Sequence, residues 1–388
     1  MLGKQAGLKI SHMDVARIST EIASELHARQ EQRSRQHARR ALQAPAGQPP
    51  IEIACVQMDG GRIRTRAADQ GPGVHEHAWK EDKVGVLWKM KGPTFEVDPH
   101  PEPPPCFCDK PHVLHLVRGL KQQAQGVASE ADGNPEAESV SQPAEEPAED
   151  AKKKPKRLWP PERVFRTCVA TMRDVHHFGP VLAAESQRRG FYDAPRQVFL
   201  GDGDSKNWTV QTVHFPHFTA VTDFVHPVAY VFEAAGAVTN SPAAAWEQYL
   251  EWMTDCWQGR VQKVLQDLQQ WQDRLGQPPP DAQEQDPREI VRRSGTYLTN
   301  NSQRMDYPAY RRQGLPITSC LVESAIKQIN WRVKGTEKFW NRPDGAEAIL
   351  QLRAAILSDG EPLTTFVSSR PGCLYHRRST ANSPKPLS

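Results

Sequence analysis

Three acidic residues, far apart along the chain, are the side chains best suited to chemistry. Asp59 follows the apolar run IEIACVQM, Asp202 follows RQVFLG, and Glu323 lies near the start of the helical run LVESAIKQINWRVKG. Mg²⁺ prefers oxygen ligands, and a pair of such ions activates a water or a 3′ hydroxyl for attack at phosphorus. Most Asp-Gly steps are plain turns. The prediction of a two-metal site therefore depends on the combination: two strand ends followed by a helix.

The elements that must position these carboxylates are those of an α/β protein. Residues 59–61, Asp-Gly-Gly, are a tight-turn signal between two β-rich runs, and a third such run follows. We predict antiparallel strands first, then helices, and then two buried strands that end at Asp202 and Asp223. The predicted strands are 51–58, 62–66, 84–90, 197–200 and 218–222, and the predicted helices between them are 113–127, 160–175 and 177–190.

The second half of the chain is predominantly helical by its periodicity. Large apolar residues recur at helical spacing through 242–275, which predicts one long helix whose stripe serves packing. We predict further helices at 286–299, 321–335 and 343–357, and no regular element in the tail from 359. The helices between Asp223 and Glu323 therefore form an insertion in the catalytic domain.

The N-terminal segment predicts a basic helix. Ser11 with Asp14 is typical of a helix start. The run AGLKISHMDVARI resembles the turn and second helix of a helix-turn-helix. One interpretation is a DNA-binding arm, and the other is a solvated amphipathic helix or coiled-coil stub. The arginines that would contact DNA are Arg29, Arg33, Arg35, Arg39 and Arg40.

Composition sets the remaining limits. The chain has 388 residues and a net charge of +3, which is too small to indicate nucleic-acid binding by itself. Residues 128–150 are acidic and poor in apolar residues, and 152–157 are basic, which predicts a disordered insertion. Seven cysteines, mostly within apolar runs, indicate reduced thiols. No membrane span or signal peptide is recognisable, so we expect a cytoplasmic protein.

A zinc site is a weaker alternative in the first half of the chain. Cys106, Cys108, His112 and His115 are four potential ligands close in sequence. Cys-x-Cys is not the usual ligand spacing, and the two histidines fall where a helix should begin.

Longer blocks resemble a known family. VQMDGGRIRTR, FLGDGDSKNW with HFPHFTAVTDFVHPVAYVFEAA, and RMDYPAYRRQGLPITSCLVESAIKQINWRVKGTEKFWNRPDGAEAILQLRAA are similar to bacterial insertion-sequence transposases of the Kra type, which are related to Mutator-like transposases. The resemblance covers most of 51–358 outside the 99–160 insertion. It implies an RNase H-like α/β fold: a mixed sheet flanked by helices, with a large all-helical insertion and a helical N-terminal arm.

By this resemblance, the catalytic and metal-binding residues are Asp59, Asp202 and Glu323, with two Mg²⁺ or Mn²⁺ ions per site. His226, three residues after Asp223, would orient a carboxylate or contact the scissile phosphate. It could equally cap a helix or pack in a core. The implied division is 1–50 basic DNA-binding arm, 51–120 first part of the catalytic domain, 121–160 disordered insertion, 161–223 second part, 224–316 helical insertion, 317–358 Glu-bearing helices and 359–388 irregular tail.

The resemblance also implies DNA contacts after Glu323. Lys327 lies one helical turn later, where it would meet a phosphate or simply pair with Glu323. The basic run that follows, interleaved with tryptophans, suits backbone contacts and stacking on bases. Its charged members are Arg332, Lys334, Lys338 and Arg342.

The implied activity is cleavage at the ends of an insertion sequence and transfer of the 3′ hydroxyl into target DNA. The partners would be double-stranded DNA and further copies of the chain, in a nucleoid-associated, cytoplasmic setting. Thr318, Ser319 and Cys320 stand where the family has smaller residues, and the N-terminus is short. Two alternatives therefore stay open: a truncated relic that binds DNA without cutting it, and a structure-selective nuclease.

Overall fold

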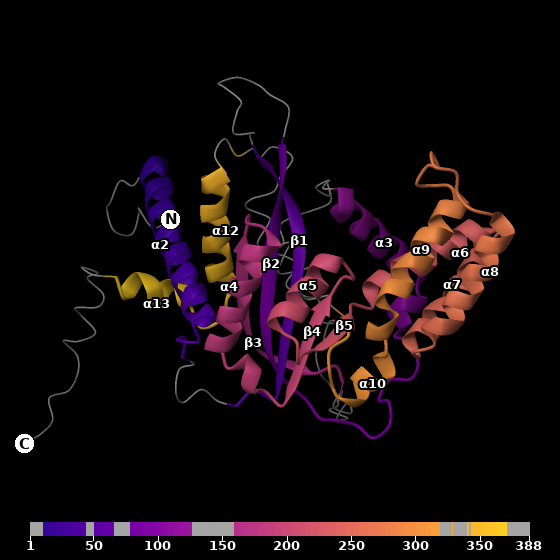
Figure 1. Ribbon diagram of the computed structural model, residues 1–388, viewed down its shortest axis with the longest axis horizontal. Helices are drawn as coiled ribbons and strands as arrows, with labels where there is room; N and C mark the ends of the chain where they lie inside the picture. Colours follow the sequence, from indigo (N-terminus) through magenta and orange to yellow (C-terminus); the bar gives the residue numbers. More distant parts are fainter. Residues whose placement is uncertain are drawn as a thin grey trace, which may run out of the picture.

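The architecture is a five-stranded mixed sheet flanked by helices, as described by a computed structural model (Figure 1). The described residues are 11–43, 50–65, 78–125, 159–318, 328, 340 and 343–370. Most of the acidic-basic insertion, the predicted helix 321–335 except Gln328, and the end of the tail lie outside them. None of the described helices is long and apolar enough to cross a membrane.

The sheet has the order β3-β2-β1-β4-β5. Strand β2 runs antiparallel to its two neighbours β1 and β3, and β4 and β5 run parallel to β1. The carboxyl ends of β1, β4 and β5 therefore point the same way. The strands are β1 (Ile53–Thr65), β2 (Ala78–Lys91), β3 (Glu162–Thr171), β4 (Arg196–Gly201) and β5 (Thr219–Thr222).

The turn predicted at Asp59-Gly60-Gly61 is wrong, because β1 is one continuous strand. Neither glycine has a positive φ, and β2 pairs with β1 along its whole length, including Asp59 with Val84. Because β2 extends past Asp59, it hydrogen-bonds with the backbone groups of β1 that a turn would leave without a strand partner. Asp59 thus lies within a strand rather than at the end of one.

The helix predicted over 160–175 is also wrong. Residues 162–171 form β3, which is an edge strand paired with β2. The segment VFRTCVAT is rich in β-branched residues, which fit a pleated surface better than a helix. Pairing with the free edge of β2 then favours a strand over a helix in this segment.

Helices form layers on both faces of the sheet. One face is covered by α4 and α5, with a core around Phe178, Leu182 and Phe199. The other face is covered by α3, α6 and α12, and its core continues into the helical end of the molecule. The helices are α2 (His12–Ala38), α3 (Lys110–Gln125), α4 (Val175–Arg188), α5 (Ser205–His214), α6 (Val225–Val238), α7 (Pro242–Trp257), α8 (Val261–Leu275), α9 (Pro287–Asn301), α10 (Tyr307–Arg312), α12 (Pro343–Leu357) and α13 (Pro362–Ser368), with short 3-10 turns at Pro105–Cys108, Phe191–Asp193 and Ser302–Arg304.

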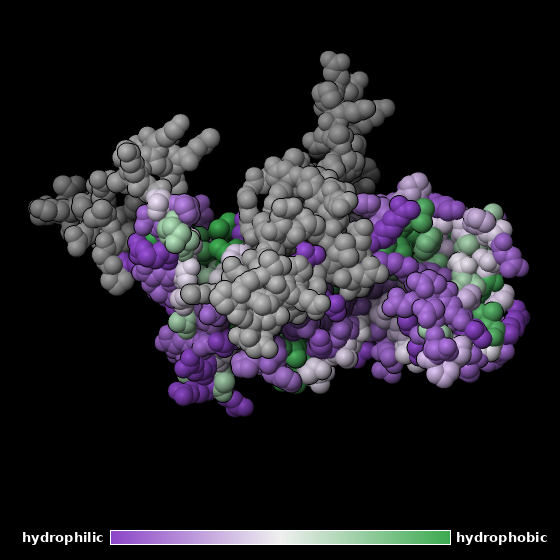
Figure 2. Space-filling view, turned by 90° about the horizontal axis from the view of Figure 1, so that it is seen from above, coloured by the Kyte–Doolittle hydropathy of each residue, from purple (hydrophilic) through white to green (hydrophobic). Residues whose placement is uncertain are grey.

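The helices predicted between Asp223 and residue 316 are present, but 242–275 is two helices. Gly259, with a φ of +75°, breaks the run between α7 and α8, and the buried stripe is divided between them. Trp252 and Trp257 are fully buried on α7. Figure 2, seen from above, shows a mainly hydrophilic surface at this end, with hydrophobic residues in smaller patches.

The two ends of the described chain lie against the β3 side of the sheet (Figure 1). Helix α2 begins at Ser11 with a capping box, as predicted, and packs against α4 and α12. The tail is not wholly irregular, because α13 forms and buries Phe366. A seven-residue helix is too short to show a periodic signal in sequence.

Candidate active site

The register of the parallel strands brings Asp59 and Asp202 together. Gln57 on β1 is paired with Leu200 on β4. Asp59 and Asp202 each lie two residues further along, so they lie at the same level of the sheet on neighbouring segments of the chain. Adjacent strands are about 4.8 Å apart. Strand alternation directs both side chains to the face that carries Cys55, Ile63 and Leu200 in its core.

A third carboxylate extends this row. Asp223 follows β5, and its N–H donates to the carbonyl of Gly201 (2.8 Å), which continues the ladder beyond the end of β4. Val221 is paired with Leu200, so Asp223 lies beside Asp202. We call Asp59, Asp202 and Asp223 the carboxylate row. Its members Asp202 and Asp223 follow the carboxyl ends of β4 and β5, which is the usual ligand-binding edge of parallel strands, while Asp59 lies within β1.

Asn207 links the first two members of the row. Its buried amide donates to Oδ1 of Asp202 (2.6 Å) and reaches the carbonyl of Met58 at 3.5 Å. Asn207 lies on α5, the helix that follows β4 after a tight turn. The same Oδ1 also accepts the N–H of Asp204 (2.8 Å). These contacts fix the orientation of the Asp202 carboxylate.

Helix α9 braces the turn that carries Asp202. The Tyr297 hydroxyl donates to the backbone carbonyl of Asp202 (2.8 Å), and its ring stacks on Tyr230 with centroids 3.9 Å apart. Burial raises the pKa of Tyr297 well above its ordinary value, so the hydroxyl keeps the proton that it donates. Asn301 accepts the indole N–H of Trp208 (2.9 Å) and lies near Gly203.

His226 is held beside the row. Its Nε2 lies 3.8 Å from Oδ2 of Asp223, and its backbone N–H donates to the Asp223 carbonyl (3.2 Å). The side chain of Asp223 is buried, and its Oδ1 accepts the N–H of Val225 (3.3 Å). Asp223 therefore lies just before α6 and beside His226, whose predicted catalytic role stays a prediction.

A cluster of one carboxylate and two lysines borders the row at β2. Glu81 lies 3.2 Å from Lys206 Nζ and 3.0 Å from Lys83 Nζ. Burial opposes ionisation of Glu81, but the hydrogen bonds from Lys83 and Lys206 outweigh it and lower its pKa. The two cations are thus directed to Glu81.

The geometry fits a divalent cation in part. Asp59 and Asp202 supply hard oxygen ligands on neighbouring strands, and the donors to Asp202 are all at Oδ1. Within the ranges that the structure describes, no three His, Cys, Asp or Glu side chains gather closely enough to hold a metal ion. Glu323 lies outside those ranges. The chain that leads to it passes Ile317, whose carbonyl accepts the N–H of Phe224 (2.9 Å), next to Asp223.

The predicted zinc ligands are not gathered. Cys106 and Cys108 lie on an exposed 3-10 turn, and His112 and His115 lie on the exposed side of α3. All four residues are described, and no three of them form a group that could bind a metal. The N–H of His112 donates to the carboxylate of Asp109 (3.1 Å), so this stretch is a helix start.

The predicted DNA-contacting arginines divide into two groups. Two of them point back to the protein: Arg29 over the Phe366 ring and Arg33 toward Glu185. The other three are exposed near the end of α2, namely Arg35, whose partner Glu31 lies on the same helix, Arg39 and Arg40. The remaining predicted contacts lie outside the described residues, namely Lys327, Arg332, Lys334, Lys338 and Arg342.

Several site residues had no clear signal in the sequence. Asn207 lies one helical turn after a strand-ending Asp-Gly, which is a signal that could have been used. Tyr297 and Asn301 come from a distant helix, and nothing local to Asp202 points to them. No family model matches the sequence, and no curated protein matches it. Function must therefore be inferred from residues and geometry.

Proposed function

We propose that the chain is a metal-dependent DNA transposase of the Asp-Asp-Glu class, with an RNase H-like catalytic domain. It cleaves DNA at the ends of an insertion sequence and joins the resulting 3′ hydroxyl to target DNA. One observation carries the proposal: the register of β1 and β4 pairs Gln57 with Leu200, so Asp59 and Asp202, singled out by sequence, each lie two residues beyond a paired position on neighbouring segments. The strand order, with three antiparallel strands followed by two parallel to the first, supports the RNase H-like assignment.

The residues divide the work as follows. Asp59, Asp202 and Glu323 would hold two Mg²⁺ or Mn²⁺ ions, which supply charge stabilisation at the attacking and leaving oxygens of a phosphodiester. Asn207 and Tyr297 hold Asp202 in place through its carboxylate and its carbonyl. Asp223 orients His226 toward the same edge. No nucleophilic side chain is required, because water and the 3′ hydroxyl attack in turn.

An open hollow beside the row supports access by DNA. It begins at Gly203 and Asp204, runs along the exposed side of α5 and ends at Asn300 and Arg304. Arg304 lies over the ring of Trp208 at 4.5 Å. Arg304 and Trp208 in this hollow would contact a phosphate and a base.

The test is strand transfer by the full chain. Labelled duplexes from the DNA that flanks the reading frame are incubated with target plasmid and Mg²⁺ or Mn²⁺, and nicked and joined products are separated on gels. Asp202→Asn should lower both products by more than about a hundredfold, because a lost ligand is at least as costly as a lost supporting residue. Asp204→Asn is the matched control: it removes a nearby charge but retains a good N-cap for α5.

The outcomes separate the alternatives. Undiminished joining by Asp202→Asn would refute the catalytic assignment. Cutting without joining by the wild type would favour a structure-selective nuclease. DNA binding without metal-dependent cutting would favour an inactive relic.

A further inference from the structure

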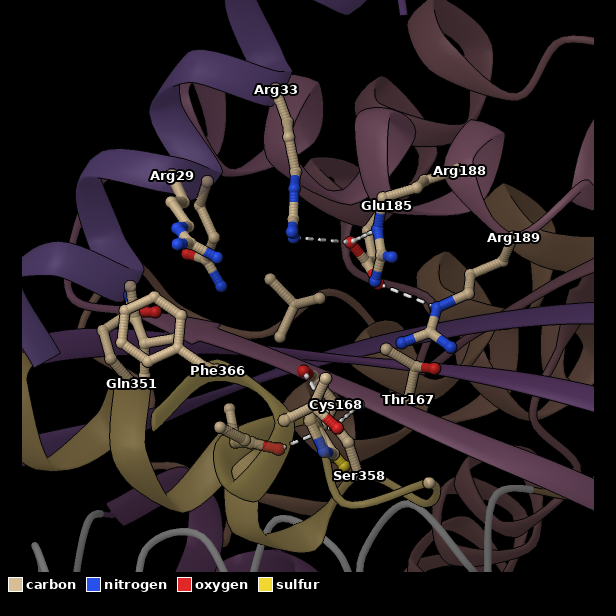
Figure 3. A pocket seen from close by; sticks show the side chains of 18 of the residues that line it. Arg29, Arg33, Thr167, Cys168, Glu185, Arg188, Arg189, Gln351, Ser358 and Phe366 are labelled. Carbon is tan, nitrogen blue, oxygen red and sulfur yellow. Dashed lines mark hydrogen bonds and ion pairs between the residues drawn. The ribbon is translucent and has the colours of Figure 1, made fainter. Parts of the chain in front are cut away.

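A second concentration of charge lies at the other side of the sheet, against β3. A cavity of about 310 Å³ opens between α2, α4, β3 and the α12–α13 segment. Four arginines line it: Arg29 and Arg33 from α2, Arg188 from α4, and Arg189 just after α4. Figure 3 shows Arg33 directed across the cavity to Glu185, near Arg188 and Arg189, with Arg29 on the side of Phe366.

One carboxylate pairs with most of these arginines. Glu185 accepts hydrogen bonds from Arg188 (2.6 Å) and Arg189 (2.9 Å), and Arg33 lies 3.6 Å from it. The other carboxylate that lines the cavity is Asp359, which accepts the backbone N–H of Arg166 (2.6 Å). Among the lining residues that the structure describes, four guanidinium groups against two carboxylates leave an excess of two positive charges.

The arginines are held in place before any ligand arrives. Arg29 lies 4.3 Å above the Phe366 ring, and Arg189 lies 5.3 Å from the Phe165 ring. Arg188 and Arg189 have about a quarter or less of their side-chain surface exposed. Such fixed, partly desolvated guanidinium groups bind phosphate with little further loss of side-chain freedom.

We propose that this cavity, which we call the arginine pocket, binds a small phosphorylated ligand that carries at least two negative charges. The excess charge matches a diphosphate or a larger phosphate group. The volume is near the lower end of the range for small-molecule sites and suits a compact ligand rather than a duplex. Thr167 also lines the cavity and adds a hydroxyl to its polar groups.

The electrostatics of Arg33 support this proposal. Burial lowers its pKa, and the charge of Arg188 lowers it further, against the opposing effect of Glu185. The positive groups therefore repel one another in the ligand-free protein. A bound anion relieves that repulsion.

The experiment is calorimetric titration of the full chain with inorganic pyrophosphate at moderate salt, followed by the same titration with Arg33→Gln. Removing Arg33 leaves Glu185 paired with Arg188 and Arg189. We expect saturable one-site binding by the wild type and at least about tenfold weaker binding by the variant, as for a lost charge-assisted hydrogen bond. Arg29→Gln replaces this variant if Arg33→Gln does not fold, as judged by thermal unfolding.

Arg35→Gln is the matched control, because it removes the same charge from the same helix. Its partner is Glu31 at 3.2 Å, and it does not line the pocket. It should bind pyrophosphate as the wild type does. The proposal is overturned if the wild type shows no binding, if Arg35→Gln loses as much affinity as Arg33→Gln, or if a short DNA duplex displaces pyrophosphate stoichiometrically. The pocket does not depend on the proposed transposase activity.

Discussion

Gly203 offers a sharp test of how the site is built. It follows Asp202 and has a φ of +100°. A Cβ there would lie 2.5 Å from Cε2 and 2.7 Å from the hydroxyl of Tyr297, and 2.9 Å from Nδ2 of Asn301. The Tyr297 ring cannot easily yield, because it is stacked on Tyr230. Gly203→Ala should therefore be strained both in its backbone and by its neighbours.

The magnitude follows from these two contributions. The left-handed backbone costs an L-residue about 1–2 kcal/mol. Forcing a methyl group against packed atoms costs about 1–3 kcal/mol more. Gly203→Ala should thus lower the free energy of unfolding by about 2–5 kcal/mol. Because the displaced groups hold Asp202, metal-dependent cleavage should fall as well.

A matched control separates the two contributions. Gly190 also has a positive φ, +74°, but the nearest atom to its Cβ would be Cδ1 of Ile51 at 4.0 Å. Gly190→Ala should cost only the backbone contribution of about 1–2 kcal/mol. Urea denaturation of both variants measures the difference. If Gly203→Ala destabilised the protein no more than Gly190→Ala, the close packing of α9 on the Asp202 turn would be refuted.

Two further predictions test the supports of the site and the fold. Asn207→Ala removes the hydrogen bond that holds the Asp202 carboxylate, so it should raise the Mg²⁺ concentration for half-maximal cleavage about 10–100-fold. DNA retention on gels should not change. An unchanged Mg²⁺ requirement would exclude this role. The Arg311 side chain is fully buried and donates to Asp98 at 2.6 Å, so Asp98→Asn should cost about 3–5 kcal/mol at pH 7. Burial opposes ionisation of Asp98, but hydrogen bonds from Arg311 outweigh it and lower its pKa. The ion pair therefore stabilises the fold at pH values above the ordinary Asp pKa of about 3.9. This contribution is lost as the pH falls through the lower pKa that Asp98 has in the folded protein. The free energy of unfolding, measured at decreasing acidic pH, should therefore decline less steeply for Asp98→Asn than for the wild type.

The sequence predicted those elements whose signals are local. The start of α2 follows from the Ser11–Asp14 capping box, and α9 and α12 follow from helical periodicity. Strands β4 and β5 are short apolar runs bounded by Asp-containing turns. Each depends on residues within about one or two turns of one another, so the pattern survives without knowledge of the fold.

The errors arose where a partner strand or a distant contact decided the outcome. Glycine after Asp59 is typical of a turn, but pairing with β2 keeps the chain extended there. The segment that became β3 has apolar residues compatible with a helix, yet the edge of β2 was open to it. The arginines of α2 have the composition of a DNA-binding helix, but two of them, Arg29 and Arg33, face the rest of the protein.

The sequence by itself determined which carboxylates deserve attention, because Asp59 and Asp202 each follow an apolar run that must be buried. Only the tertiary structure decided that they lie side by side, since strand register is set by long-range pairing that no local pattern encodes. The support of Asp202 by Tyr297 joins residues 95 positions apart. The arginine pocket likewise exists only because α2 and α4 pack together at the β3 side. This packing brings the positive charges of the arginines close together, and its favourable energy offsets their repulsion.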